Sequence, residues 1–219
     1  MSARRFDLLV FDWDGTIVDS AGHIAASIQA ACADLELPVP SREAARHVIG
    51  LGMRDAMAYL LPQLEQARHR EVAERYRYHF LAGDEAIETF PEVDAGIPQL
   101  EDEGFMLAVA TGKSRVGLDR ALRKVPFGSC FLATRCGDEG FPKPHPDMLL
   151  HLMELAGASP HRTLMIGDTS HDLELAANAG ANSLAVTYGA HTHDTLQQHA
   201  ALDCVHSFRE LMEWLKENA

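Results

Sequence analysis

Three short apolar runs of this chain end in the same kind of polar residue, and this repetition is the feature that most restricts its fold. The runs LLVF, LAVA and LMIG are followed by Asp12, Thr111 and Asp168. Apolar runs of this length, separated by segments with helical spacing, predict parallel strands covered by helices on both faces. All strands of a parallel sheet end at the same edge, so these three residues should converge there. The sequence therefore predicts an α/β fold with a Rossmann-like, doubly wound parallel sheet.

Strands and helices are not evenly distributed along the chain. Strand-like runs are absent between about residues 17 and 90. In that stretch, apolar residues at helical spacing predict helices at 19–36, 41–48, 53–61 and 63–81. Beyond it the two types alternate, with strands expected at 105–110, 129–134, 163–167 and 182–187 and helices at 91–103, 114–124, 146–156 and 171–179. We therefore expect a core made of residues 1–18 and 89–219, with residues 19–88 inserted as a small α-helical domain.

The composition and the charge narrow the classes of function. An apolar fraction of 47% is enough for a packed core, and 23% charged residues suits a soluble protein. A net charge of −13 argues against nucleic acid or an anionic membrane as the main partner, but it leaves a small anionic substrate open. No apolar stretch approaches the roughly 18 residues of a membrane span, and the first residues do not form a secretory signal. We expect a cytoplasmic protein that is a monomer or a homodimer.

The cysteines, and the histidines of the polar stretch near residue 192, do not favour a transition-metal site. The four cysteines show no CxxC spacing, which argues against structural zinc. His191 and His193 are separated by one residue in a polar stretch, a pattern more typical of a loop than of a metal site. Any metal site in this chain is therefore expected to use oxygen ligands.

The segment DWDGT places two carboxylates directly after the first apolar run. Asp12 and Asp14 are two residues apart, so on a regular strand they would share one face. Neighbouring carboxylates repel each other unless a cation or a proton lies between them. Gly15 allows the chain to turn away from the strand, and Thr16 adds a hydroxyl group. Asp can act as a covalent nucleophile, but an acidic loop that caps the next helix would show the same pattern.

Two further segments offer groups that bind anions. In TGKS, the Thr111 hydroxyl and the Gly112 N–H lie at an expected helix start, where anions bind readily, although Ser114 could be a simple helix cap. In PKPHP, prolines on both sides of Lys143 fix the backbone before a helix. A rigidly held ammonium group suits a phosphoryl group, and a solvated loop lysine is the alternative.

The segment GDTSHD supplies a second pair of carboxylates. Asp168 and Asp172 are four residues apart, which places them on one side of the first turn of a helix. Together with Asp12 and Asp14 they would form a pocket of oxygen ligands, which favours Mg²⁺. Helix capping is the alternative role for Asp172.

Taken in order, DWDGT, ATGKS, the Lys143 loop and GDTSHD resemble the four motifs of the haloacid dehalogenase-like hydrolase superfamily. The chain looks most similar to the phosphoglycolate phosphatase-type members and next to the beta-phosphoglucomutase-like ones. This resemblance spans nearly the whole chain. It implies a Rossmann-like core with a helical cap between the first two motifs. It also implies Mg²⁺-dependent hydrolysis of a small phosphate monoester through an aspartyl-phosphate, with a phosphomutase or a pyrophosphatase on the same core as alternatives.

The resemblance implies roles for the residues that react. Asp12 would be the nucleophile and would also ligate Mg²⁺. Asp14 would protonate the leaving oxygen, deprotonate the attacking water and ligate Mg²⁺ through its backbone carbonyl. Lys143 would offset the charge of the nucleophile and the phosphate. A non-catalytic binding protein with this fold would be expected to have lost one of these three residues, and all three are present.

The resemblance also implies how phosphate and metal are held. Thr111 and the Gly112 N–H would bind phosphoryl oxygens, and Thr16 is a further candidate for phosphate binding. Asp168 would be a direct metal ligand, and Asp172 would support the metal site from behind.

Substrate choice is expected to depend on the helical insertion. The turn GLGMR ends in Arg54 and matches the glycine-containing turn that faces the active site in capped relatives. Arg54 is a candidate for binding a substrate carboxylate or a second phosphate, and a solvated helix arginine is the alternative. His23, Arg46 and His47 are weaker candidates. Residues 19–88 contain no lysine, which argues against the Schiff-base chemistry of phosphonate-cleaving relatives.

Overall fold

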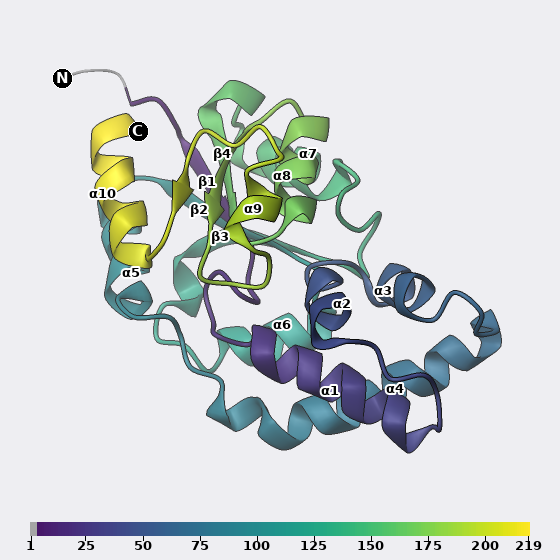
Figure 1. The fold of residues 1–219 in the computed structure, drawn as a ribbon. Helices are drawn as coiled ribbons and strands as arrows, with labels where there is room; N and C mark the ends of the chain where they lie inside the picture. Colours follow the sequence, from purple (N-terminus) through teal and green to yellow (C-terminus); the bar gives the residue numbers. More distant parts are fainter. Residues whose placement is uncertain (1–3) are drawn as a thin grey trace.

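The apolar runs form a single parallel sheet in the computed structural model, which describes residues 4–219 (Figure 1). The strand order is β3-β2-β1-β4-β5-β6, and every neighbouring pair is parallel. The strands are β1 (Leu8–Phe11), β2 (Met106–Thr111), β3 (Phe131–Cys136), β4 (Thr163–Gly167), β5 (Asn182–Val186) and β6 (Cys204–Val205). The order reverses direction between β1 and β4, where such sheets bind ligands outside the carboxyl ends of the strands. The predicted doubly wound architecture is confirmed.

Side chains alternate between the two faces of the sheet. In β1, Leu9 and Phe11 belong to a core cluster with residues of α5 (Val93–Asp102), α6 (Arg115–Leu122) and α10 (Phe208–Asn218). Leu8 and Val10 belong to a second cluster with residues of α7 (Asp147–Ala156) and α8 (Ser170–Asn178). Because both faces are covered, the central strands are mostly apolar, and polar residues that could bind a ligand follow them at their carboxyl ends.

Residues 19–88, the helical segment, leave the core after β1 and return before α5. They contain α1 (Ala21–Asp34), α2 (Arg42–His47), α3 (Met53–Leu60), α4 (Gln66–Gly83) and the short 3₁₀ helix η1 (Asp84–Ala86). These helices have a hydrophobic cluster largely of their own, and Figure 1 shows them at one end of the core. The outgoing and returning chains lie side by side, since the Asp19 N–H donates to the Glu88 carbonyl and the Phe90 N–H to the Ile17 carbonyl. The chain therefore leaves the core and returns to it at adjacent positions.

Most expected elements are present, with shifted ends. The helix expected from residue 91 begins at Val93, because Glu92 adopts a left-handed conformation with φ of 72°. His193, expected in a loop, opens the short helix α9 (His193–Leu196), for which the Thr192 hydroxyl accepts the Thr195 N–H. Strand β6 and helix α10 lie beyond the last element expected from the sequence. Between residues 4 and 219, the structure contains no helix with the length and apolar character to cross a membrane.

Candidate active site

Strands β1 and β4 are neighbours, so the residues that follow them meet at the edge of the sheet. Phe11 is in register with Ile166, and the next polar residues along each strand are Asp12 and Asp168. Oxygen atoms of Asp12, Asp168 and Asp172 lie within 4.8 Å of one another, and all three side chains are buried. Of the residues expected to converge at the strand ends, Asp12 and Asp168 thus lie close together, and Asp172 from the first turn of α8 (Ser170–Asn178) joins them.

The two carboxylate oxygens of Asp12 have different surroundings. Oδ1 accepts the Trp13 N–H at 2.6 Å and lies 3.0 Å from Lys143 Nζ. Oδ2 is buried and has no hydrogen-bond partner among residues 4–219. Burial raises the pKa of Asp12 well above its usual value, and the Lys143 ammonium opposes this increase. An unpartnered, buried carboxylate oxygen needs a cation or a reacting group to compensate its desolvation.

Lys143 is the cation that holds this cluster together. Its Nζ lies 3.0 Å from Asp12 and 2.6 Å from Asp172 Oδ1, and its side chain is fully buried. Burial opposes the charge on Lys143, but the carboxylates of Asp12 and Asp172 outweigh it and raise its pKa. Asp172 Oδ2 also accepts the N–H and the hydroxyl of Thr169, a capping box at the start of α8. The capping role considered for Asp172 is thus present, and the same side chain also forms an ion pair with Lys143.

Asp168 is enclosed by backbone and by one hydroxyl. Its Oδ1 accepts the Thr16 hydroxyl at 2.8 Å, and its Oδ2 accepts the Ala190 N–H at 2.6 Å. A Cβ atom on Gly15 or on Gly189 would overlap Asp168 Oδ2, so both approaches require glycine. Burial, with repulsion from Asp172, raises the pKa of Asp168 to about 7. Thr16 donates its only hydroxyl hydrogen to Asp168. The sequence had led us to expect a contact between Thr16 and phosphate instead.

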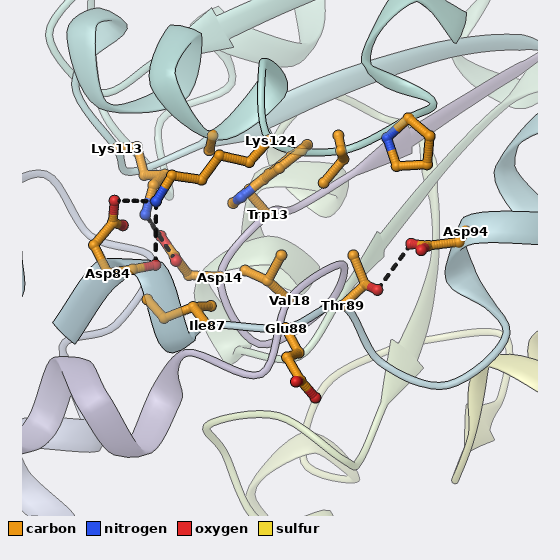
Figure 2. A pocket seen from close by; sticks show the side chains of 13 residues that line it. Trp13, Asp14, Val18, Asp84, Ile87, Glu88, Thr89, Asp94, Lys113 and Lys124 are labelled. Atoms are coloured by element: carbon orange, nitrogen blue, oxygen red, sulfur yellow. Dashed lines mark hydrogen bonds and ion pairs between the residues drawn. The ribbon is translucent and has the colours of Figure 1, made fainter.

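Asp14 points to another side of the site. Both of its carboxylate oxygens lie 2.9 Å from Lys113 Nζ, and Oδ1 also accepts the Ser20 hydroxyl at 2.7 Å. Figure 2 shows Lys113 and Asp14 facing each other at the wall of a cavity of about 340 Å³, which Asp84 and Lys124 also line. Neither Ser20 nor Lys113 is among the site residues expected from the sequence. The sequence signal that could have identified Ser20 is its hydroxyl group six residues after Asp14.

The helical segment covers the site through its glycine turn. A Cβ on Gly112 would lie 2.6 Å from the carbonyl oxygens of both Gly50 and Leu51. A Cβ on Gly50 would lie 3.7 Å from Asp12 Oδ2. The turn therefore faces the active site, as expected, and Thr111 is buried beneath it. Arg54 is exposed, and no side chain among residues 4–219 forms an ion pair or hydrogen bond with its guanidinium group.

The three weaker candidates for substrate contact have other partners. His23 Nε2 hydrogen-bonds with the Phe80 carbonyl at 2.8 Å. Arg46 donates to the carbonyls of Gly189 and Ala190. The His47 ring stacks on His191 with centroids 5.2 Å apart. All three stabilise the helical segment or its contact with the core.

The donor set at this edge of the sheet fits a hard divalent cation. The buried ligand candidates are carboxylate oxygens, and the unpartnered Asp12 Oδ2 lies among them. Hard oxygen donors select Mg²⁺ or a similar ion over softer metals. A cation at Asp12 Oδ2 would remove the one uncompensated carboxylate oxygen of the cluster.

The family assignment follows from comparison with known proteins. The model of the haloacid dehalogenase-like hydrolase family matches residues 9–186, which is more than half of the chain. The chain belongs to this family. The family's four motifs, as expected from the sequence, lie at the carboxyl ends of β1, β2 and β4 and in the loop before α7. The predicted membership is confirmed, and the protein is a hydrolase.

Individual relatives support the same assignment over almost the full length. The chain is 34% identical to a probable phosphatase IndB of Dickeya dadantii, covering 94% of this chain and 91% of the relative. It is 30% identical to a phosphoglycolate phosphatase of Mannheimia succiniciproducens, covering 84% and 87%. The crystal structure of a hydrolase from Pseudomonas syringae superposes with a TM-score of 0.90 at 20% identity, covering 97% and 99%, which shows the shared fold.

Proposed function

We propose that this hydrolase is a Mg²⁺-dependent phosphatase that hydrolyses a small phosphate monoester through an aspartyl-phosphate on Asp12. The observation that carries the proposal is the asymmetry of the Asp12 carboxylate. One oxygen is held by the Trp13 N–H and Lys143, and the other is buried and has no hydrogen-bond partner among the described residues 4–219. Matched relatives are named phosphatases, and several are named phosphoglycolate phosphatases. A carboxylate held rigidly at one oxygen and free at the other suits nucleophilic attack.

The first half of the reaction forms the covalent intermediate. One Asp12 oxygen attacks phosphorus while the bond to the leaving oxygen breaks, and Asp14 gives its proton to that oxygen. Burial raises the pKa of Asp12, and the adjacent Lys143 ammonium opposes this rise and so favours the ionised form that attack requires. Thr111 and the Gly112 N–H would hold phosphoryl oxygens near the glycine turn, which lies against Gly112.

The second half releases phosphate. A water oxygen attacks phosphorus, Asp14 takes a proton from that water, and the bond between phosphorus and Asp12 breaks. Asp14 is suited to both proton transfers because it lies at the cavity wall, outside the buried cluster. Ser20 and Lys113 hold its carboxylate in one orientation. After phosphate leaves, Asp12 and Asp14 are back in their starting forms.

The metal would be held by Asp12, Asp168 and the backbone carbonyl of Asp14, with Asp172 supporting the site through Lys143. A divalent cation bound there neutralises charge on the phosphoryl oxygens, which is the main requirement of phosphoryl transfer. Three carboxylates and one lysine leave the site anionic, so an anionic phosphate ester needs this added positive charge.

The helical segment is proposed to act as a cap that selects the substrate. The core residues described above serve the phosphoryl group and the metal. The rest of the substrate would therefore be read by the cap, with Arg54 as the candidate for an anionic group such as a carboxylate. A small ester that carries a carboxylate in addition to its phosphate, of the phosphoglycolate type, fits this arrangement.

The test is a phosphatase assay of the purified protein over small phosphate esters, with and without Mg²⁺. We expect phosphate release that stops after chelation and returns with Mg²⁺, and excess Ca²⁺ should inhibit because its longer bonds misplace the nucleophile. Full activity after chelation would contradict the role of the metal. Phosphate release that requires added sugar bisphosphate would favour a phosphomutase instead.

A further inference from the structure

One loop joins the proposed metal ligand Asp168 to the cap. Residues 188–191, the 188–191 loop, follow β5 and run past the carboxylate. The Ala190 N–H donates to Asp168 Oδ2 at 2.6 Å, and the His191 N–H donates to the Asp168 carbonyl at 3.2 Å. Gly189 approaches so closely that a Cβ would overlap both Asp168 and the Gly15 carbonyl. The position of this loop therefore determines the position of the Asp168 carboxylate.

The cap binds the same loop from the opposite side. Arg46, in α2, donates from Nη2 to the Gly189 carbonyl at 2.5 Å and from Nε to the Ala190 carbonyl at 3.1 Å. The Ala190 side chain is buried in the hydrophobic cluster of the cap helices. The loop is thus held between the cap and the metal-binding carboxylate.

A single peptide group connects the Arg46 guanidinium to the Asp168 carboxylate. The carbonyl of the Gly189–Ala190 peptide accepts from Arg46, and the N–H of the same peptide donates to Asp168. A trans peptide is planar, and its carbonyl and N–H point in opposite directions. The cation on one side polarises the peptide and strengthens the N–H donor that meets the carboxylate on the other side.

Imidazole groups fix the same junction. His171 Nε2 and His191 Nε2 both hydrogen-bond with the His47 carbonyl of the cap, at 2.8 and 3.1 Å. His191 Nδ1 accepts the Ser170 N–H at 3.1 Å, so the proton of its neutral ring is on Nε2, which donates to the cap. The contacts that Arg46 and His47 make with this junction are thus formed only while the cap lies against the core.

We propose that closure of the cap and binding of the divalent cation are coupled through the Gly189–Ala190 peptide, with Arg46 as the positioning residue. When the cap is closed, Arg46 fixes the peptide and the peptide orients Asp168. When the cap moves away, the peptide loses its cation and Asp168 loses a fixed donor. The coupling rests on the proposed function, because it takes Asp168 as a ligand of the metal. Coupling between two sites is reciprocal, so bound metal must in turn favour the closed cap.

The first test measures metal affinity without substrate or turnover. Free Mn²⁺ is followed by electron paramagnetic resonance during titration of the wild-type protein and of three variants, Arg46→Ala, Arg46→Lys and Arg42→Ala. Arg42 is the matched control: it is in the same helix α2, and its side chain forms no hydrogen bond or ion pair with any part of the chain from residue 4 onward.

We expect Arg46→Ala to weaken Mn²⁺ binding roughly 10- to 100-fold, the usual effect of losing a group that orients a metal ligand. Arg42→Ala should bind as the wild type does, and Arg46→Lys should be intermediate, because an ammonium group cannot span two carbonyls.

The second test uses the reciprocal effect and holds even if Arg46→Ala folds poorly. Hydrogen–deuterium exchange of the wild-type protein is compared with and without saturating Mg²⁺, and we expect slower exchange in the 188–191 loop and in α2. Unchanged exchange there, or an Arg46→Ala variant that binds Mn²⁺ as tightly as the wild type, would overturn the coupling and leave the proposed function intact. A wild-type protein that binds neither ion would overturn both.

Discussion

The core side and the cap side of the proposed substrate site differ in how firmly their polar groups are held. On the core side, Asp12, Asp168 and Asp172 are buried, and each accepts at least two hydrogen bonds or ion pairs. On the cap side, Arg54 is exposed and is not paired with any residue in the part of the chain that the structure describes. Charged groups that are buried and paired keep one geometry, whereas an exposed arginine samples many rotamers.

This difference assigns the two sides different tasks. A fixed cluster is suited to stabilise the same phosphoryl group in every substrate, because its geometry is set before the substrate arrives. An unpaired arginine gains a partner only when a substrate supplies one. Changes on the core side should therefore affect all substrates alike, and changes on the cap side should affect some substrates more than others.

A large loss of rate on every substrate is expected for Asp14→Asn. Asparagine keeps the backbone carbonyl and the side-chain volume but cannot transfer the proton, so the rate should fall about 10²- to 10⁴-fold for every substrate. Steady-state kinetics with phosphoglycolate and with an aryl phosphate would measure this, with the melting temperature as a control for folding. A near-wild-type rate would remove Asp14 from the proton transfers.

A smaller and selective effect is expected for Arg54→Ala. Loss of a charged contact should cost roughly 1.5–3 kcal/mol, or about one to two decades in kcat/KM, for an anionic substrate such as phosphoglycolate, mainly through KM. An aryl phosphate whose aryl group carries no charge should be almost unaffected. Arg70→Ala is the matched control, because Arg70 is also an exposed arginine of the helical segment. Equal losses for both substrates would mean that Arg54 supports the structure of the cap, and no loss for either would identify it as a solvated arginine.

The smallest effect is expected on the free energy of unfolding, through His191 at the contact between cap and core. Burial lowers the pKa of His191 to about 4 from a usual value of 6.5. Between these two pKa values, the His191 imidazole binds a proton in the unfolded chain but not in the folded protein. The contribution of His191 to the free energy of unfolding is therefore fully present above about pH 6.5 and is lost as the pH falls towards 4. At pH 5 the loss from His191 should be roughly 2 kcal/mol.

The measurement is thermal unfolding of the wild type and of His191→Gln at pH 7 and pH 5, with saturating Mg²⁺. Glutamine does not titrate, so the stability difference between the two proteins should shift in favour of the variant at pH 5. The same difference at both pH values would show that His191 is not held neutral at this junction.

The sequence predicted the core side well because its signals are local. Asp12, Thr111 and Asp168 each follow an apolar run directly, and the parallel order of the strands brings their ends together without further information. Gly50 was found for a similar reason, since two glycines within three residues break a helical pattern. Patterns that are read within about ten residues are enough for features of this kind.

The junction between cap and core could not be predicted in the same way. Arg46 is 144 residues from Ala190 in sequence, and Lys113 is 99 residues from Asp14. Nothing near Arg46 indicates that its partner is a pair of backbone carbonyls, because carbonyls are present at every residue. Contacts of this kind depend on how the cap lies on the core, and helical periodicity contains no information about that placement.

The central claim, that Asp12 carries the phosphoryl group, is tested most directly by trapping the intermediate. The protein would be mixed with Mg²⁺ and phosphate ester, quenched rapidly in acid and reduced with borohydride, which converts an aspartyl-phosphate to homoserine. Peptide mass spectrometry should then find homoserine at position 12, and the Asp12→Asn variant should give neither the trapped product nor measurable turnover. Homoserine at another position, or substantial turnover by Asp12→Asn, would contradict the account.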